Sequence, residues 1–236
     1  MVRNNVLFIG ATHGDEVESI KVLKELDRLI KKNKSDWIIG NEVAFPKGKR
    51  YIDVDLNRAS PGDSSSNTYE EKRAAEIINI SQRFNYTIDL HTTKSDTGVF
   101  VIITKPTIEN IFLACSLEVD NIVIWSSKRS SIKGPLTKDV GCGVEVEFGP
   151  RGKLHDKLND FILETINKDI KVQLDNIKKK DIFYVYGKLL KPTRGLENFK
   201  EINIKNEIFY PILVDEYSDI ACYKTKKLNL IDLLSY

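Results

Sequence analysis

The sequence predicts an α/β fold, in which helices flank a mostly parallel mixed sheet and a small β-rich domain follows at the C-terminal end. Over the first 180 residues, short apolar runs alternate with segments of helical periodicity, which is typical of strands joined by helices. Several of these runs are apolar throughout, as in strands that are buried on both faces of a sheet. After residue 180, strand-like segments follow one another without a strong helical period.

The length of 236 residues suits one α/β domain with a sizeable core and a small appended domain. The character of the sequence changes after the charged stretch NIKKKD at 176–181. We therefore expect a main domain over residues 1–180 and a β-rich domain over residues 181–236.

The expected elements can be placed in chain order. The apolar run at 4–11 predicts a strand, and apolar residues at helical spacing predict a helix over about 17–32. Further strands are expected at 36–45, 84–91, 98–104, 121–126 and 143–148, with helices at 69–84 and 154–170. The strand-like segments of the C-terminal part are 181–190, 201–204, 207–214 and 219–231.

Composition argues against several classes of protein. The 36 Lys and Arg residues balance 34 Asp and Glu residues without a long basic block, so nucleic-acid binding is not favoured. No apolar stretch approaches the roughly 20 residues that a helix needs to cross a bilayer, so no membrane segment is predicted. Three cysteines without a CxxC pair or a signal peptide predict reduced thiols in a cytoplasmic protein.

Two histidines and a glutamate lie where the predicted strands end. His13 and Glu16 belong to GATHGDE, a loop between the first strand and the first helix, and His91 ends the strand TIDLHTT. Open α/β sheets bind ligands at this carboxyl edge. A set of two histidines and one glutamate leaves zinc a fourth position for water. Gly10 and Gly14 are expected to let the loop turn tightly.

Other interpretations of these residues stay open at this point. A single histidine is more often a surface or core residue than a ligand, and HGDE is also compatible with a turn before a charged helix start. The third histidine, His155, is interpreted as a surface or capping residue. A phosphate-binding loop is the weakest alternative, because Asp15, Glu16 and Glu18 would repel phosphate.

A long polar loop carries the motif RYIDVDLNR. Arg50, Asn57 and Arg58 crowd this loop, and arginine is the side chain best shaped to grip a carboxylate through two hydrogen bonds. The alternation of polar and apolar residues is also compatible with a plain amphipathic strand. The basic residues favour an anionic substrate.

Two glutamates lie on the predicted strand GVEVEF. Glu145 and Glu147 are two residues apart, so their side chains point to one face. Burying both carboxylates without partners would be costly, so we expect at least one of them to face water or a functional site. Two exposed glutamates on an edge strand are the alternative.

In this order, the motifs GATHGDE, RYIDVDLNR, DLHTT and EFGP resemble the aspartoacylase and succinylglutamate desuccinylase family, a branch of the zinc carboxypeptidase-like enzymes. They span residues 10–150, and the segment FYPILVDEYSDIACYKTKKLNL resembles the family's C-terminal domain. The stretch VEFGPRG is closer to aspartoacylase. The resemblance implies a zinc carboxypeptidase-like catalytic domain over residues 1–180 and a zinc-dependent amidohydrolase that deacylates N-acyl amino acids.

The resemblance also implies a metal site and catalytic roles. His13, Glu16 and His91 would hold one zinc ion per chain. Arg50 would stabilise the oxyanion of the tetrahedral intermediate. Glu147 would act as general base and then as general acid, because EFG fits the family's Glu-x-Gly pattern and EVE does not.

Further implied roles concern the substrate. Asn57 and Arg58 would hold its α-carboxylate, and Tyr217 is the candidate for the family's substrate-contacting tyrosine, with a loop residue as the alternative. Asp55 and Asp89 fall within the motifs and are expected to orient neighbouring groups.

One stretch departs from the family pattern. Aspartoacylases carry a tyrosine and an arginine for the side-chain carboxylate shortly before the general-base strand, whereas this chain reads WSSKRSSIKGPLTKDVGCG. Lys128, Arg129, Lys133 and Lys138 are candidates to replace them.

The most specific function that the resemblance implies is aspartoacylase, which converts N-acetyl-aspartate to acetate and aspartate. Succinylglutamate desuccinylase or another N-acyl-amino-acid deacylase is the alternative within the same class. A metal- or carboxylate-binding protein on the same fold is the non-enzymatic alternative, but neither a ligand nor the base is missing. The expected partner is a small anionic N-acyl amino acid, and homo-oligomerisation is left open.

Overall fold

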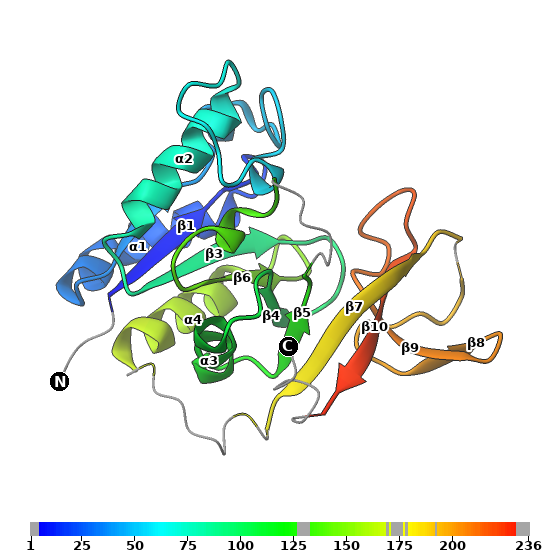
Figure 1. Ribbon diagram of the computed structural model, residues 1–236. Coiled ribbons are helices and arrows are strands. Elements are labelled where there is room, and N and C mark those ends of the chain that lie inside the picture. The colour runs from blue at the N-terminus through cyan, green and yellow to red at the C-terminus, as the bar shows by residue number, and fades with distance from the viewer. Residues whose placement is uncertain are drawn as a thin grey trace.

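Ten strands form one sheet in the computed structural model, which describes residues 5–126, 133–168, 170, 177, 179–191 and 193–229. The strand order is β2-β1-β3-β6-β4-β5-β7-β10-β9-β8 (Figure 1). The strands up to β6 are β1 (Val6–Gly10), β2 (Asp36–Ile39), β3 (Tyr86–Thr92), β4 (Val99–Ile103), β5 (Asn121–Ile124) and β6 (Gly143–Phe148). The later strands are β7 (Asp181–Leu189), β8 (Ile202–Ile204), β9 (Glu207–Ile212) and β10 (Cys222–Leu228).

The predicted mostly parallel mixed sheet is confirmed. The strands β2, β1, β3 and β6 run parallel, as do β4, β5 and β7, while β4 is antiparallel to β6. The described helices are α1 (Glu18–Lys32), α2 (Tyr69–Ser81), α3 (Ile108–Ser116) and α4 (His155–Asn167). Short 3-10 turns lie at Phe45–Lys47, Leu56–Arg58 and Leu136–Lys138.

Two local expectations were wrong. The strand expected at 36–45 ends at Ile39, and a 3-10 turn with a proline in its first positions occupies Phe45–Lys47. Helix α3 was not expected. It begins after Thr107, whose hydroxyl accepts a hydrogen bond from the Asn110 N–H, so a side-chain cap starts this nine-residue helix.

Helices cover both faces of the main sheet. Apolar residues of α1, α3 and α4 pack with the strands into the largest core cluster, which includes Leu23, Val101 and Leu158. On the other face, α2 and the polar loop pack on β1 through a smaller cluster that contains Leu56 and Ile77. Because β1, β3 and β6 are neighbouring parallel strands, their carboxyl ends lie at the same edge of the sheet (Figure 1).

The C-terminal strands extend the same sheet. Strand β7 pairs in parallel with β5, and β10, β9 and β8 follow in antiparallel order, drawn from yellow to red in Figure 1. Phe183 and Ile212 pack here against Phe100 of β4 in a third core cluster. The division into domains at residue 180 stays a prediction.

Two composition-based expectations can be compared with the structure. All three cysteines, Cys115, Cys142 and Cys222, are free, and burial raises the pKa of each thiol to about 11. In the described part of the chain, no helix combines the length and the apolar character needed to cross a bilayer.

Candidate active site

The predicted site residues meet at the carboxyl edge of three neighbouring strands. His13 lies on the loop after β1, His91 lies near the end of β3, and Glu147 lies near the end of β6. Because β3 and β6 pair in parallel with His91 directly opposite Glu147, these two residues are adjacent across the sheet. Sheet register, rather than a flexible loop, thus fixes the distance between the candidate ligand and the candidate base.

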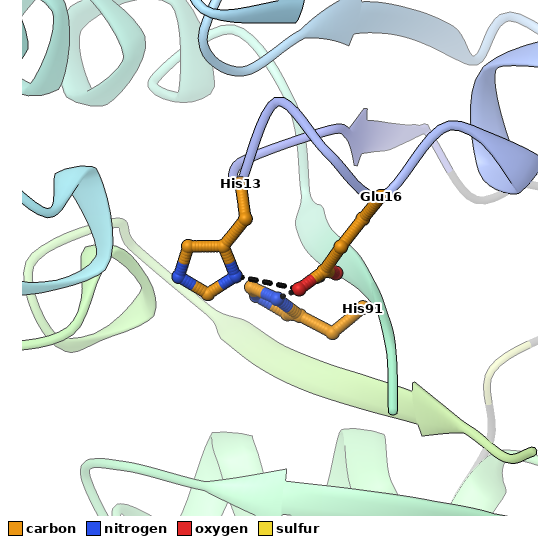
Figure 2. Close-up of side chains that lie close together, drawn as sticks. All are labelled: His13, Glu16 and His91. Atoms are coloured by element: carbon orange, nitrogen blue, oxygen red, sulfur yellow. Dashed lines mark hydrogen bonds and ion pairs between the residues drawn. The ribbon is translucent and has the colours of Figure 1, made fainter. Parts of the chain in front are cut away.

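His13, Glu16 and His91 form a compact buried triad (Figure 2). The Nδ1 atom of His13 lies 2.7 Å from Oε1 of Glu16, and Nδ1 of His91 lies 3.3 Å from Oε2 of the same carboxylate. All three residues are at most 5% exposed, and their ligand atoms lie within 4.8 Å of one another. The predicted donor set is therefore brought together in space.

Close packing of the backbone shapes the loop that carries His13 and Glu16. A Cβ atom on Gly14 would lie 2.5 Å from Phe45 N and Lys49 O, so this position has room only for glycine. The residue with a left-handed backbone is Ala11, with φ of 53°, not Gly10. The expectation that the two glycines provide the tight turn is corrected. Gly14 instead allows the backbone of the 44–49 segment to pack directly against this loop.

A second carboxylate lies beside the far nitrogen of each histidine. His13 Nε2 is 3.2 Å from Asp55 Oδ1, and His91 Nε2 is 3.0 Å from Asp89 Oδ2. Neither Asp89 Oδ2 nor His91 Nε2 has a hydrogen bond of good geometry within the described structure, although both are buried. A carboxylate behind a ligating imidazole is the common arrangement at zinc sites, where it orients the ring.

The triad fits a divalent metal ion. The Asp89 carboxylate, 3.0 Å from Nε2 of His91, favours a proton on that nitrogen. The Nδ1 lone pair then faces the Glu16 carboxylate at 3.3 Å, and two acceptors at this distance need a cation or a proton between them. Two imidazoles and a carboxylate are a donor set that zinc uses in catalytic sites. His91 also belongs to a second group of donors with Asp89 and Glu145, but that group contains only one imidazole.

Arg151 and the backbone of Thr92 position Glu16. Thr92 N donates to Glu16 Oε2 at 2.8 Å, and Arg151 Nη2 lies 3.4 Å from Oε1. The Arg151 guanidinium also donates to the Thr92 carbonyl at 3.0 and 3.1 Å. The sequence interpretation did not assign Arg151 a role, although this residue directly follows the EFGP motif.

Charge and burial act against each other in the site. Burial lowers the pKa of His91, but Asp89 and Glu16 outweigh it and hold this pKa well above its usual value. Burial is also the largest influence on the pKa of each glutamate of β6: it raises the pKa of Glu147 to about 8, and it raises the pKa of Glu145 as well. Both glutamates line the pocket, so the alternative of two exposed glutamates is wrong.

The loop motif RYIDVDLNR brings Arg50 beside the triad. Arg50 Nη2 lies 2.8 Å from His13 Nε2 and 3.5 Å from Asp55 Oδ2. The loop is held by Glu70 of α2, whose carboxylate accepts hydrogen bonds from three consecutive backbone N–H groups at 52–54. The alternative of an amphipathic strand is wrong here, because the segment Leu56–Arg58 forms a 3-10 turn.

A pocket of about 520 Å³ opens beside the triad. Its lining includes the predicted residues Arg50, Asn57, Arg58, Glu147 and Tyr217. Asn57 is 5% exposed, and its Oδ1 accepts a hydrogen bond from the Leu136 N–H at 2.9 Å. Tyr217 is 39% exposed, and burial of its hydroxyl raises the pKa to about 12.

Four basic residues were candidates to bind a side-chain carboxylate of the substrate, and the structure places two of them at the pocket. Lys133 and Lys138 both line the pocket, whereas Lys128 and Arg129 lie outside the described residues. Lys133 forms an ion pair with Glu71. His155 is placed as expected, on the surface at the start of α4, where it pairs with the exposed Glu25 at 2.7 Å.

Comparison with curated proteins points to one family. Residues 3–170 match the model of the succinylglutamate desuccinylase/aspartoacylase catalytic domain. The chain is 29% identical over 198 residues to a probable aspartoacylase of Prochlorococcus marinus strain MIT 9312, covering 76% of this chain and 65% of the relative. It is 28% identical over 214 residues to a probable aspartoacylase of Trichodesmium erythraeum, covering 79% and 73%. The match thus spans just under two thirds of the Prochlorococcus relative.

Solved structures share the fold. Murine aminoacylase 3 superimposes with a TM-score of 0.75 at 18% identity, covering 95% of each chain. Succinylglutamate desuccinylase from Chromobacterium violaceum gives a TM-score of 0.67 at 18% identity, covering 97% of this chain and 86% of that one. Because the family model matches residues 3–170, most of this chain, the chain belongs to the succinylglutamate desuccinylase/aspartoacylase family.

Proposed function

We propose that this protein is a zinc-dependent hydrolase that removes the acyl group from a small anionic N-acyl amino acid. The observation that carries the proposal is the register pair of His91 and Glu147, which brings the half-buried Glu147 carboxyl group next to a buried triad of side chains that could hold a metal ion. With a metal ion bound to the triad, this arrangement would place an electrophilic centre and a proton acceptor at one point of the pocket.

His13, Glu16 and His91 are the residues that would hold the metal. When bound, zinc would polarise the amide carbonyl and make water a better nucleophile near neutral pH. Asp89 and Asp55 would keep the two imidazoles oriented, and Arg151 would keep the Glu16 carboxylate in place. The chain itself thus supplies a fixed and largely dry set of ligands.

Glu147 would move the proton. Its carboxylate takes a proton from the attacking water and passes that proton to the amine nitrogen as the amide bond breaks. Burial raises the pKa of Glu147 to about 8, so its carboxyl group can both accept and release a proton near neutral pH.

Arginines would bind the negative charges of the substrate. Arg50 lies beside His13 and would stabilise the oxyanion that forms on the amide carbonyl. Arg58, which lines the same pocket with Asn57, would pair with the α-carboxylate. Tyr217 also lines the pocket and would contact the bound substrate.

The proposed substrate class includes N-acetyl-aspartate, the first candidate from the sequence, and succinyl-glutamate as the alternative. A metal- or carboxylate-binding protein on the same fold would keep the metal but release no amine. Cytoplasmic location and homo-oligomerisation stay predictions.

The test combines metal analysis with an assay of amine release. The purified chain is loaded with zinc, and its metal content is measured. It is then assayed on a panel of N-acetyl and N-succinyl amino acids. Glu147→Gln removes the proton acceptor but keeps the shape, and we expect a loss of at least about 100-fold in kcat with zinc retained. Glu164→Gln, on the exposed face of α4, is the matched control and keeps full activity.

Two outcomes would contradict the proposal. One is a wild-type chain that binds no divalent metal in stoichiometric amount. The other is a Glu147→Gln variant that hydrolyses the panel as fast as the wild type. Stoichiometric zinc without hydrolysis of any panel member would favour the non-enzymatic alternative.

A further inference from the structure

Two chemically different sets of residues line the pocket beside the triad. The polar set includes His13, the arginines and the two glutamates of β6. The apolar set, which we term the apolar wall, consists of Ile102, Trp125, Val185, Leu213, Tyr217 and Tyr223. The proposed function uses the polar set and leaves the apolar wall, apart from Tyr217, without a role.

The apolar wall is a preformed surface. The rings of Trp125 and Tyr223 meet edge to face with centroids 4.4 Å apart, and the backbone N–H of Trp125 donates to Ile103 O at 2.9 Å. Trp125, Val185 and Tyr223 pack against the third core cluster. A flat apolar group can therefore lie against this wall without first ordering it.

The apolar wall offers little support to a second carboxylate on the substrate. Glu145, buried in the pocket, lies opposite Ile102 in the register of β6 and β4, so a carboxyl group faces the same space as the wall. The amine of Lys133 pairs with Glu71, and Lys138 also lines the pocket. A substrate carboxylate placed against the Trp125 ring would lose part of its hydration, and none of the six residues of the wall carries a positive charge to compensate.

We infer that the pocket selects an N-acyl amino acid that carries a bulky apolar or aromatic group, with that group against the apolar wall. This inference rests on the proposed function and narrows its substrate class. The α-carboxylate remains the only charge that the substrate needs, and it faces Arg58. The apolar group belongs either to the amino-acid side chain or to the acyl group.

Binding to the metal-free chain provides the first test, because it does not depend on turnover. Calorimetry compares N-acetyl-phenylalanine, N-phenylacetyl-glycine and N-acetyl-aspartate. We expect one aromatic ligand to bind at least about tenfold more tightly than N-acetyl-aspartate, the gain expected for burying part of an aromatic ring. The tighter of the two aromatic ligands identifies which end of the substrate meets the wall.

Variants then test whether the apolar wall causes the preference for the aromatic ligand. Trp125→Ala should remove most of the preference for the aromatic ligand, and Trp125→Phe should restore part of it. Val185→Lys places a cation on the wall and should shift the preference toward N-acetyl-aspartate. Because this variant keeps Trp125, it is an independent test of the wall. Trp37→Phe, on β2 and outside the pocket, is the control and should leave the preference unchanged.

A variant of Lys138, which lines the pocket, tests whether the pocket instead prefers a substrate with an acidic side chain. If N-acetyl-aspartate binds more tightly than both aromatic ligands, and Lys138→Met abolishes that preference, the inference is overturned. It is also overturned if Trp125→Ala and Val185→Lys leave the relative affinities unchanged. A chain that binds the aromatic ligand more tightly but hydrolyses nothing when loaded with zinc would overturn the proposed function and leave this inference standing.

Discussion

At the level of single residues, the position of Arg50 between the candidate metal site and the open pocket suggests a role in the reaction. Its guanidinium lies against His13 Nε2 at 2.8 Å while its side chain stays 38% exposed to the pocket. It can therefore contact both the candidate metal site and a substrate. Asp55 lies close enough to Arg50 and His13 to hold both in place.

Replacing Arg50 tests whether it acts in the transition state. Arg50→Lys keeps the charge but loses the planar fork, and we expect kcat to fall by about 10²-fold with little change in KM, as for the loss of an oxyanion donor. Steady-state kinetics on the best substrate and zinc analysis check this. Arg83→Lys, on the exposed turn after α2, should behave as wild type. A rise in KM with unchanged kcat would assign Arg50 to substrate binding instead.

At the level of elements, α2 and the polar loop depend on one residue. Glu70 is fully buried and accepts hydrogen bonds from the N–H groups at 52–54 and from Asn41 Nδ2 at 2.9 Å. Burial alone would raise the pKa of Glu70, but these hydrogen bonds outweigh it and lower the pKa. The loop that presents Arg50 and Arg58 is thus fixed from the first turn of a helix.

The pKa of Glu70 predicts a pH dependence of stability. Because the folded-state pKa is lowered, its contribution is present above the unfolded pKa of about 4.3 and is lost as pH falls through the folded value. We expect Glu70→Gln to be less stable than wild type at pH 7, by about 1–3 kcal/mol, and the difference to shrink below about pH 4. Urea unfolding across this range measures it, with Glu164→Gln as control. A difference that does not change with pH would contradict the prediction.

At the level of the whole molecule, hydrogen bonds join the C-terminal segment to the residues that directly follow β3, the strand that carries His91. One carboxylate oxygen of Glu216 accepts hydrogen bonds from the Thr93 hydroxyl and from the backbone N–H groups of Lys94 and Ser95, the latter two at 2.6 and 3.0 Å. Glu216 directly precedes Tyr217. The position of Tyr217 at the pocket is therefore linked to the end of β3.

Removing the hydrogen bonds of the Glu216 carboxylate should weaken substrate binding more than it slows the hydrolysis step. We expect Glu216→Ala to raise KM about tenfold, because Tyr217 is no longer held over the pocket, while zinc content stays the same and kcat changes little. Glu197→Ala removes an exposed glutamate that pairs with the nearby Lys200, and it should leave KM unchanged. An unchanged KM in Glu216→Ala, or a loss of zinc, would show that the contact does not position Tyr217.

Periodicity located most of the elements of this fold. Strand β6 and the first helix lie where the apolar pattern placed them, because buried strands and amphipathic helices leave strong local signals. Helix α3 was missed, since it has only nine residues and begins at a side-chain cap within an apolar region. Capping and tight turns depend on a few atoms, so they are weakly marked in a sequence.

By itself, the sequence determined the alternation of strands and helices and the four motifs that mark the family. The short spacing of His13 and Glu16 places them on one loop, and strand ends are where such residues meet. Only the tertiary structure decided that His91 lies opposite Glu147, that Arg151 and Glu216 hold the site, and that an apolar wall lines the same pocket as the arginines. These contacts join residues that are distant in the chain, and only strand register and packing bring such residues together.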